Sequence, residues 1–136
     1  MAAITTDRNT PIRAAEDFEY PVDAGKKIYA GALVVVDTVD NLAKPAVTAT
    51  TGRCVGVAQA LADNSAGADG DVTVKVRRGC FLFKNSAAGD LVDLGDVGLD
   101  CYIVDDQTVA KTNGTNTRSV AGKVRDVDAD GVWVEI

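Results

Sequence analysis

The chain has 136 residues, a net charge of −6 and no histidine. This length is enough for one domain that buries an apolar core without a metal ion or disulfides. The acidic balance argues against nucleic-acid binding, because contacts to phosphates need clustered lysine and arginine side chains. The longest apolar run, Ala32 to Val36, is too short to span a bilayer, so we expect no membrane insertion. The first residues lack the features of a signal peptide, and we therefore expect synthesis in a cytoplasm.

Residues 1–20 are polar, with no sustained apolar period, and Pro11 interrupts them. We predict an extended N-terminal arm over residues 1–20, followed by a single β domain over residues 21–136. Such an arm needs a surface to lie on, because alone it cannot bury enough area to offset the entropy lost on ordering. A frayed tail is the alternative interpretation. The candidate contacts of the arm are its apolar and basic residues: Ile4, Arg8, Ile12, Arg13, Phe18 and Tyr20.

Short apolar or alternating segments follow, separated by turn residues, and each is typical of a strand. The predicted strands cover residues 32–37, 53–61, 72–78, 80–83, 101–104 and 108–111. Thr38–Thr51 is predicted to be a loop around Pro45. Gly79 interrupts an otherwise continuous strand pattern, which indicates a bulge or a sharp bend where the chain turns a corner.

The C-terminal segment, Ser119–Ile136, has the pattern of a β-hairpin. Its residues alternate with a period of two on both sides of Asp128-Ala-Asp-Gly131, where Asp and Gly favour a turn. The segments 55–58 and 72–78 have the same character and predict a second hairpin. No window longer than ten residues has helical spacing. The chain is therefore predicted to be nearly all β, a small barrel or a sandwich of hairpins.

Three cysteines, Cys54, Cys80 and Cys101, are odd in number and widely spaced. A disulfide framework would pair them, and a zinc site would bring two close together. Each lies next to strand-like residues, so we predict that they are small buried apolar residues in a reducing compartment.

Two acidic motifs resemble known functional sites, one a calcium loop and the other a protease active site. Asp126–Gly131 matches the opening of a calcium loop, but the acidic residue expected at the twelfth position is missing and the flanks are strands rather than helices. Asp37-Thr38-Val39 is similar to the catalytic strand of an aspartic protease, with Val39 in place of the required glycine. Both motifs are better explained by turns and strand ends. We therefore predict no enzyme, no metal and no cofactor.

The densest basic position is Arg77-Arg78, at the end of an alternating strand. It could pair with acidic groups on a partner, but a solvated strand end explains it equally well.

Five segments of the chain resemble the decoration, or cement, proteins of tailed bacteriophages, particularly of Mu-like phages. They are Thr5–Arg8, Tyr20–Ile28, Arg53–Ala60, Val74–Phe81 and Asp126–Val134. The resemblance covers most of the chain, but it consists of turns and strands and contains no active site.

This resemblance implies a β-rich structural virion protein, commonly a homotrimer, on the outer surface of the capsid. It implies that the major capsid protein is the partner and that the protein stabilises junctions between capsid subunits. The candidate contact residues named above, together with Arg77 and Arg78, are then the predicted partner contacts. The alternative is a carbohydrate- or ligand-binding β module of a phage tail or fibre, although Trp133 and three tyrosines offer little aromatic surface for it.

Overall fold

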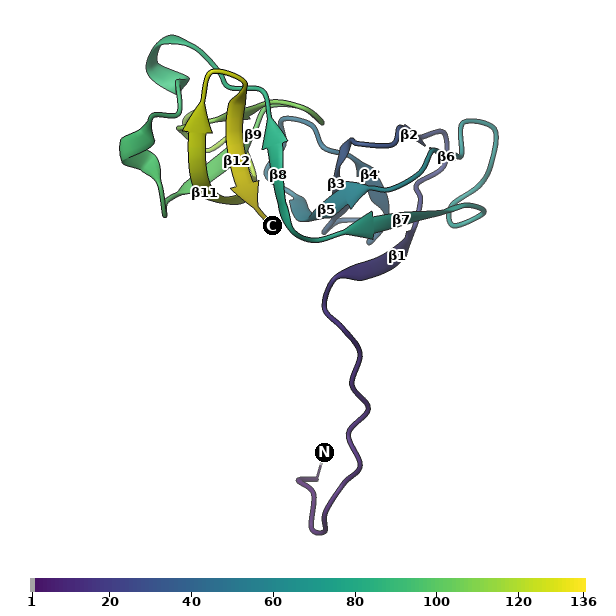
Figure 1. The fold of residues 1–136 in the computed structure, drawn as a ribbon. Helices are drawn as coiled ribbons and strands as arrows, with labels where there is room; N and C mark the ends of the chain where they lie inside the picture. Colours follow the sequence, from purple (N-terminus) through teal and green to yellow (C-terminus); the bar gives the residue numbers. More distant parts are fainter. Residues whose placement is uncertain (1) are drawn as a thin grey trace.

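The computed structural model describes residues 2–136 and contains two five-stranded antiparallel sheets and one two-stranded sheet. The two larger sheets lie side by side, and an extended N-terminal segment projects away from both (Figure 1). The only helical elements among the described residues are two short 3-10 turns, η1 (Ala88–Asp90) and η2 (Leu94–Asp96). The predicted all-β class is therefore confirmed, and its sandwich alternative fits. No helix within residues 2–136 is long and apolar enough to cross a membrane.

The first sheet has the strand order β1-β7-β5-β3-β4. Its members are β1 (Asp17–Pro21), β7 (Thr73–Arg77), β5 (Gly52–Ala58), β3 (Leu33–Asp37) and β4 (Ala43–Pro45). The predicted pairing of the second hairpin is confirmed, because β5 and β7 are antiparallel neighbours. Their connection also contains β6 (Ala62–Asp63), which pairs with β2 (Lys27–Ile28) in the two-stranded sheet.

The second sheet has the order β10-β9-β11-β12-β8. Its members are β10 (Val109–Ala110), β9 (Asp100–Ile103), β11 (Val120–Asp128), β12 (Gly131–Glu135) and β8 (Cys80–Phe83). The predicted C-terminal hairpin is confirmed as β11–β12. Bulges in β11 break its strict alternation, at Val120/Gly122 against β9 and at Val124/Asp126 against β12. The predicted corner at Gly79 is also present, because the chain leaves the first sheet after Arg77 and enters the second at Cys80.

Two clusters of buried apolar residues form the core, and β3 contributes to both. Leu33 and Val35 belong to the cluster shared with the second sheet, whereas Val34 belongs to the cluster inside the first sheet. Successive strand residues point to opposite faces, so a strand that is covered on both sides must be apolar at every position. This explains the almost continuous apolar run in β3.

The extended segment is shorter than predicted. Asp17–Pro21 is a strand of the first sheet, so the arm ends at Glu16 and the predicted boundary at residue 20 is wrong. The reason is a short alternation, in which Phe18 and Tyr20 pack against the first-sheet cluster while Asp17, Glu19 and Pro21 face solvent. Residues 2–16, called the arm below, contain no strand or helix. A smaller correction is that the predicted loop Thr38–Thr51 contains the strand β4.

The prediction that the cysteines are buried is confirmed for Cys101, holds only in part for Cys54 and is wrong for Cys80. Cys101 is fully buried and Cys54 is half-buried against the larger cluster, but Cys80 is exposed. Cys80 begins β8, an edge strand, and lies opposite Glu135 rather than inside the core. Burial raises the pKa of both the Cys54 and the Cys101 thiol to about 12.

Candidate functional site

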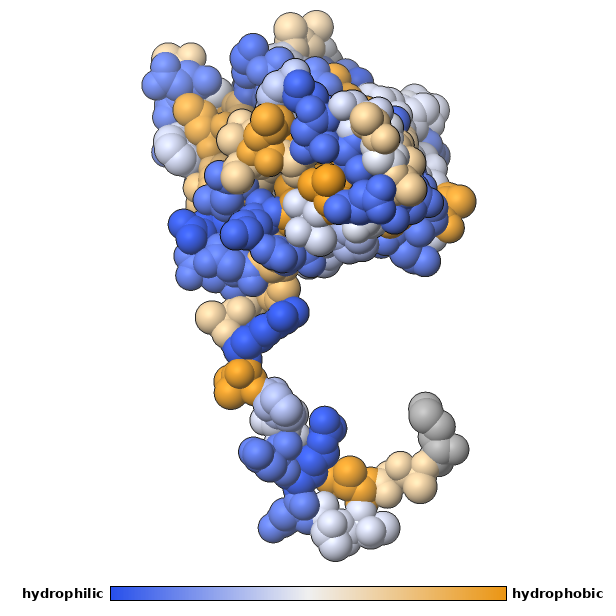
Figure 2. Space-filling model, turned by 90° about the vertical axis from the view of Figure 1, so that its right-hand side faces the viewer, coloured by the Kyte–Doolittle hydropathy of each residue, from blue (hydrophilic) through white to orange (hydrophobic). Residues whose placement is uncertain are grey.

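The arm is the most exposed part of the described chain. Ile4 is 73% exposed and Ile12 is 97% exposed, although both are large apolar side chains. Figure 2 shows the arm as a tail separate from the body, with hydrophobic residues spaced between hydrophilic ones. Arg8 is also exposed. The structure thus leaves three predicted contacts, Ile4, Arg8 and Ile12, on a segment that does not pack on its own domain.

The base of the arm brings together four other predicted residues, Arg13, Phe18, Tyr20 and Arg77. The guanidinium of Arg13 lies 4.7 Å from the centre of the Phe18 ring, a cation–π contact. The Phe18 and Tyr20 rings stack with their centres 6.3 Å apart. Arg77 lies opposite Asp17 on the neighbouring strand. Arg78 follows β7, is exposed, and donates its backbone N–H to the carbonyl of Glu16 at 2.8 Å.

Charged side chains cover the solvent face of β1 and β7. Nε of Arg77 donates to the Asp17 carboxylate at 2.8 Å, and the second guanidinium bond is 3.2 Å long. Lys75 and Glu19 form a looser ion pair at 3.9 Å. The hydrogen bond from Arg77 is the main reason that the pKa of Asp17 is lowered. These pairs neutralise one another, so this face carries charges of both signs.

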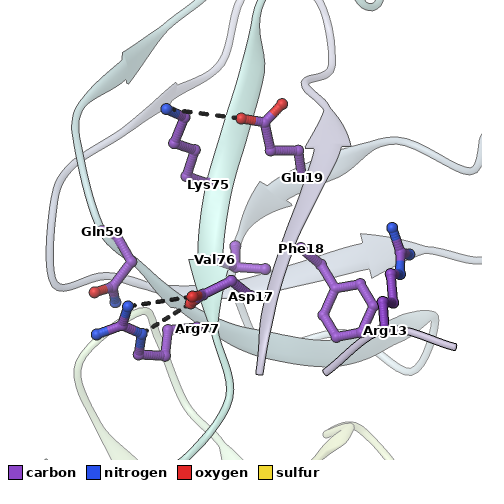
Figure 3. A pocket seen from close by; sticks show the side chains of 8 residues that line it. All are labelled: Arg13, Asp17, Phe18, Glu19, Gln59, Lys75, Val76 and Arg77. Carbon is purple, nitrogen blue, oxygen red and sulfur yellow. Dashed lines mark hydrogen bonds and ion pairs between the residues drawn. The ribbon is translucent and has the colours of Figure 1, made fainter. Parts of the chain in front are cut away.

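An open groove of about 540 Å³ lies at this edge of the first sheet. Figure 3 shows its lining: the ion pairs Asp17–Arg77 and Glu19–Lys75 on one side of the strands, and Phe18 with Arg13 on the other. Gln59 and Val76 complete the lining. Sequence reasoning missed Lys75, although the alternation of residues 72–78 places it on the same face as Arg77.

A second exposed apolar surface surrounds η1 and η2. Its large side chains are Leu91, Leu94, Val97 and Leu99, with exposed fractions between 41% and 65%. The carboxylates that flank them are paired with cations of the same chain, Asp90 with Arg118 at 3.1 Å and Asp100 with Lys123 at 2.6 Å. The sequence pattern did not reveal this apolar surface.

The acidic turn that resembles a calcium loop is explained by its own backbone. Oδ1 of Asp128 accepts the N–H of Asp130 at 2.8 Å and that of Gly131 at 3.2 Å, and Oδ2 accepts the indole N–H of Trp133 at 3.0 Å. Gly131 has φ of 146°, a conformation that disfavours other residues. Within residues 2–136, no group of three or more His, Cys, Asp or Glu side chains is placed to hold a metal ion.

Asp37, the residue compared with a protease aspartate, is neutralised by its surroundings. Its carboxylate accepts the N–H of Val39 at 2.8 Å and pairs with Lys44 at 3.0 Å. These two contacts, with Val39 first, lower the pKa of Asp37. Lys44 also contacts Asp23 at 3.5 Å and Asp40 at 2.7 Å. A lysine between the carboxylates removes the need to share a proton, which is the feature that an aspartic protease requires.

The arrangement is suited to contact with another macromolecule: an exposed arm, a groove at a sheet edge and an apolar surface around η1 and η2. Searches with the whole chain found no matching family model, no matching curated protein and no matching solved structure.

Proposed function

We propose that this protein is a structural virion protein that decorates the outer surface of a tailed-phage head and reinforces contacts between major capsid protein subunits. The observation that carries the proposal is the arm, which leaves isoleucines as far as 97% exposed on a segment that contains no strand or helix. Covering these side chains with a partner would be favourable, because it removes apolar area from water. The family resemblance of the sequence supports the same assignment.

The energetics of decoration fit this design. Each copy needs to add only a small contact across neighbouring capsid subunits, because the many copies on one head act together. The arm extends from the compact β body and can reach a second protein surface with few residues. The exposed leucines around η1 and η2 offer a second surface, so that one copy could contact two subunits.

Co-sedimentation with empty heads of the encoding phage tests the proposal. The full-length chain is expected to pellet with heads and to reach a saturating ratio. Ile12→Asp places a charge on the most exposed apolar residue of the arm and is expected to weaken binding at least tenfold. Thr10→Asp adds the same charge two residues away, on an exposed polar position, and is the matched control. Equal binding by all three proteins, or none by the full-length chain, would contradict the proposal.

A further inference from the structure

The outer edge of β1 has free backbone groups, and the ladder with β7 shows which ones. The carbonyl of Glu16 accepts the N–H of Arg78 at 2.8 Å, and the N–H of Val22 donates to the carbonyl of Val72 at 2.9 Å. Hydrogen-bonded pairs alternate with non-bonded pairs along an antiparallel ladder. Between Glu16 and Val22, the backbone groups of Phe18 and Tyr20 therefore bond to β7. Asp17, Glu19 and Pro21 therefore turn their backbone groups toward the opposite side.

Within residues 2–136, that side carries no further strand beside residues 17–19. β1 is the last strand in its sheet, and the bridge between Val22 and Ala43 of β4 begins only beyond Pro21. The open edge therefore presents the N–H groups and the carbonyls of Asp17 and Glu19. Pro21 has no N–H to offer and stands at a position where none is needed by the sheet, as expected of proline at an edge. Such an edge can take an extended segment through main-chain hydrogen bonds.

We propose that residues 2–8 of a second copy of this chain, the arm tip, pair with the open edge of β1. The arm tip contains no proline, and its centre, Ile4-Thr5-Thr6, is β-branched, as strands prefer. The remainder of the arm contains Pro11 and serves as the connection between copies.

The length of the arm favours exchange between copies. Fully extended, residues 2–16 span about 50 Å. A body of this size has a radius of gyration of about 14 Å and hence a diameter of about 35 Å. The arm therefore reaches beyond its own domain, in keeping with its course away from the body in Figure 1.

The centre of the arm tip has one side chain, Ile4, that suits the apolar face of the edge. Phe18 and Tyr20 lie on the apolar face of β1, and the ion pairs with Lys75 and Arg77 lie on the other (Figure 3). Paired residues in a ladder point to the same face. Placing Ile4 on the apolar face brings Asp7 to the other face, which carries the carboxylates of Asp17 and Glu19 as well as Lys75 and Arg77. The same register turns the backbone groups of Thr5 toward β1.

Arm exchange of this kind leaves no β1 edge unpaired when the assembly of copies is closed. Two copies can exchange arm tips reciprocally, or three or more can form a ring. The arm tip is then used between copies, and the segment around Ile12 remains available to another surface. This inference does not depend on the proposed function.

Three proline variants test it in solution, without phage heads. Thr5→Pro removes a donor that the pairing requires, and Glu19→Pro removes the facing donor on β1; neither N–H is used by the isolated chain. Thr6→Pro is the matched control, because the N–H of Thr6 points away from β1 in this register. Light scattering is expected to show an oligomer for the unchanged protein and for Thr6→Pro, and a single chain for Thr5→Pro and Glu19→Pro.

Mixing the two disrupted variants makes the test specific for exchange. Glu19→Pro retains an intact arm and Thr5→Pro retains an intact edge, so an equimolar mixture is expected to form a heterodimer through one restored contact. The absence of any association in the mixture would overturn the proposal. It would also be overturned if the unchanged protein were a single chain, or if Thr5→Pro and Glu19→Pro kept the oligomer. Because heads are absent, these failures leave the decoration proposal standing.

Discussion

The guanidinium of Arg77 holds the carboxylate of Asp17 through two hydrogen bonds, of 2.8 and 3.2 Å, across the ladder between β7 and β1. This bidentate pair fixes the strand from which the arm leaves. Both side chains are exposed, so the pair contributes little to global stability but restrains β1 locally.

Arg77→Gln is expected to speed amide hydrogen exchange at Phe18 and Tyr20, whose N–H groups bond to β7, because β1 then opens more often. The thermal midpoint is expected to change little, since both side chains are solvated. Lys75→Gln is the matched control, because the Lys75–Glu19 pair is longer, at 3.9 Å. Equal exchange rates in the two variants would show that the Arg77 pair does not restrain β1.

The carboxylates around Lys44 are expected to make the stability of the fold depend on pH. The pKa of Asp37 is lowered by the N–H of Val39 and by Lys44, and that of Asp40 is lowered chiefly by Lys44. A carboxyl group with a depressed folded-state pKa stabilises the fold above its unfolded value, 3.8 here, and this contribution is lost as the pH falls through the folded value. The thermal midpoint should therefore fall as the pH is lowered from about 5 to 2.

Lys44→Met isolates this contribution. Without the ammonium group, Asp23, Asp37 and Asp40 repel one another, so the variant should be destabilised at pH 7. The destabilisation should shrink at pH 3, where protonation of the carboxyl groups begins to relieve the repulsion. A difference in midpoint between the two proteins that is the same at both pH values would contradict this reading.

Gly122 is predicted to tolerate no side chain. A Cβ at this position would meet the backbone carbonyl of Glu135, which cannot move away without breaking the sheet. Gly122→Ala is expected to lower the free energy of unfolding by about 1–3 kcal/mol, the usual range for overpacking. Denaturant unfolding measures the loss. Gly89→Ala is the control, because a Cβ there meets nothing within 4 Å, and an equal loss in both variants would disprove the steric explanation.

Thiol labelling should distinguish the three cysteines in the folded protein. Cys80 is exposed, whereas burial raises the pKa of the Cys54 and Cys101 thiols to about 12 and leaves almost no thiolate at neutral pH. Burial raises the pKa of the Cys80 thiol as well, but this side chain is exposed, so a thiol reagent at pH 7 is expected to modify Cys80 faster than the other two, and Cys80→Ser should abolish that faster phase. Rapid modification of two or three thiols would contradict the burial described.

The strands could be predicted from the sequence where one local pattern decides the structure. The hairpin β11–β12 follows from alternation around an Asp/Gly turn, and the corner at Gly79 follows from a glycine inside a strand pattern. β4 was missed because its three residues, Ala43–Pro45, have too little pattern, and an edge strand tolerates the proline. The end of the arm was misplaced because a strand is recognised as such only when a second strand, β7, pairs with it.

The candidate site was predictable only in part, for a similar reason. The isoleucines of the arm can be recognised from composition, but the groove depends on the register that places Asp17 opposite Arg77. Pairing between strands more than fifty residues apart leaves no local trace in either segment. The exposed leucines around η1 and η2 were missed because an apolar residue in a short turn-rich segment is as often buried, as Val92 is.

The most direct test of the decoration proposal is the binding of the full-length chain, labelled at the exposed Cys80, to empty heads of the encoding phage. The proposal predicts saturable binding with a fixed number of copies per head, and release of the label when unlabelled chain is added in excess. Binding no stronger than that of an unrelated acidic protein of the same size would contradict it.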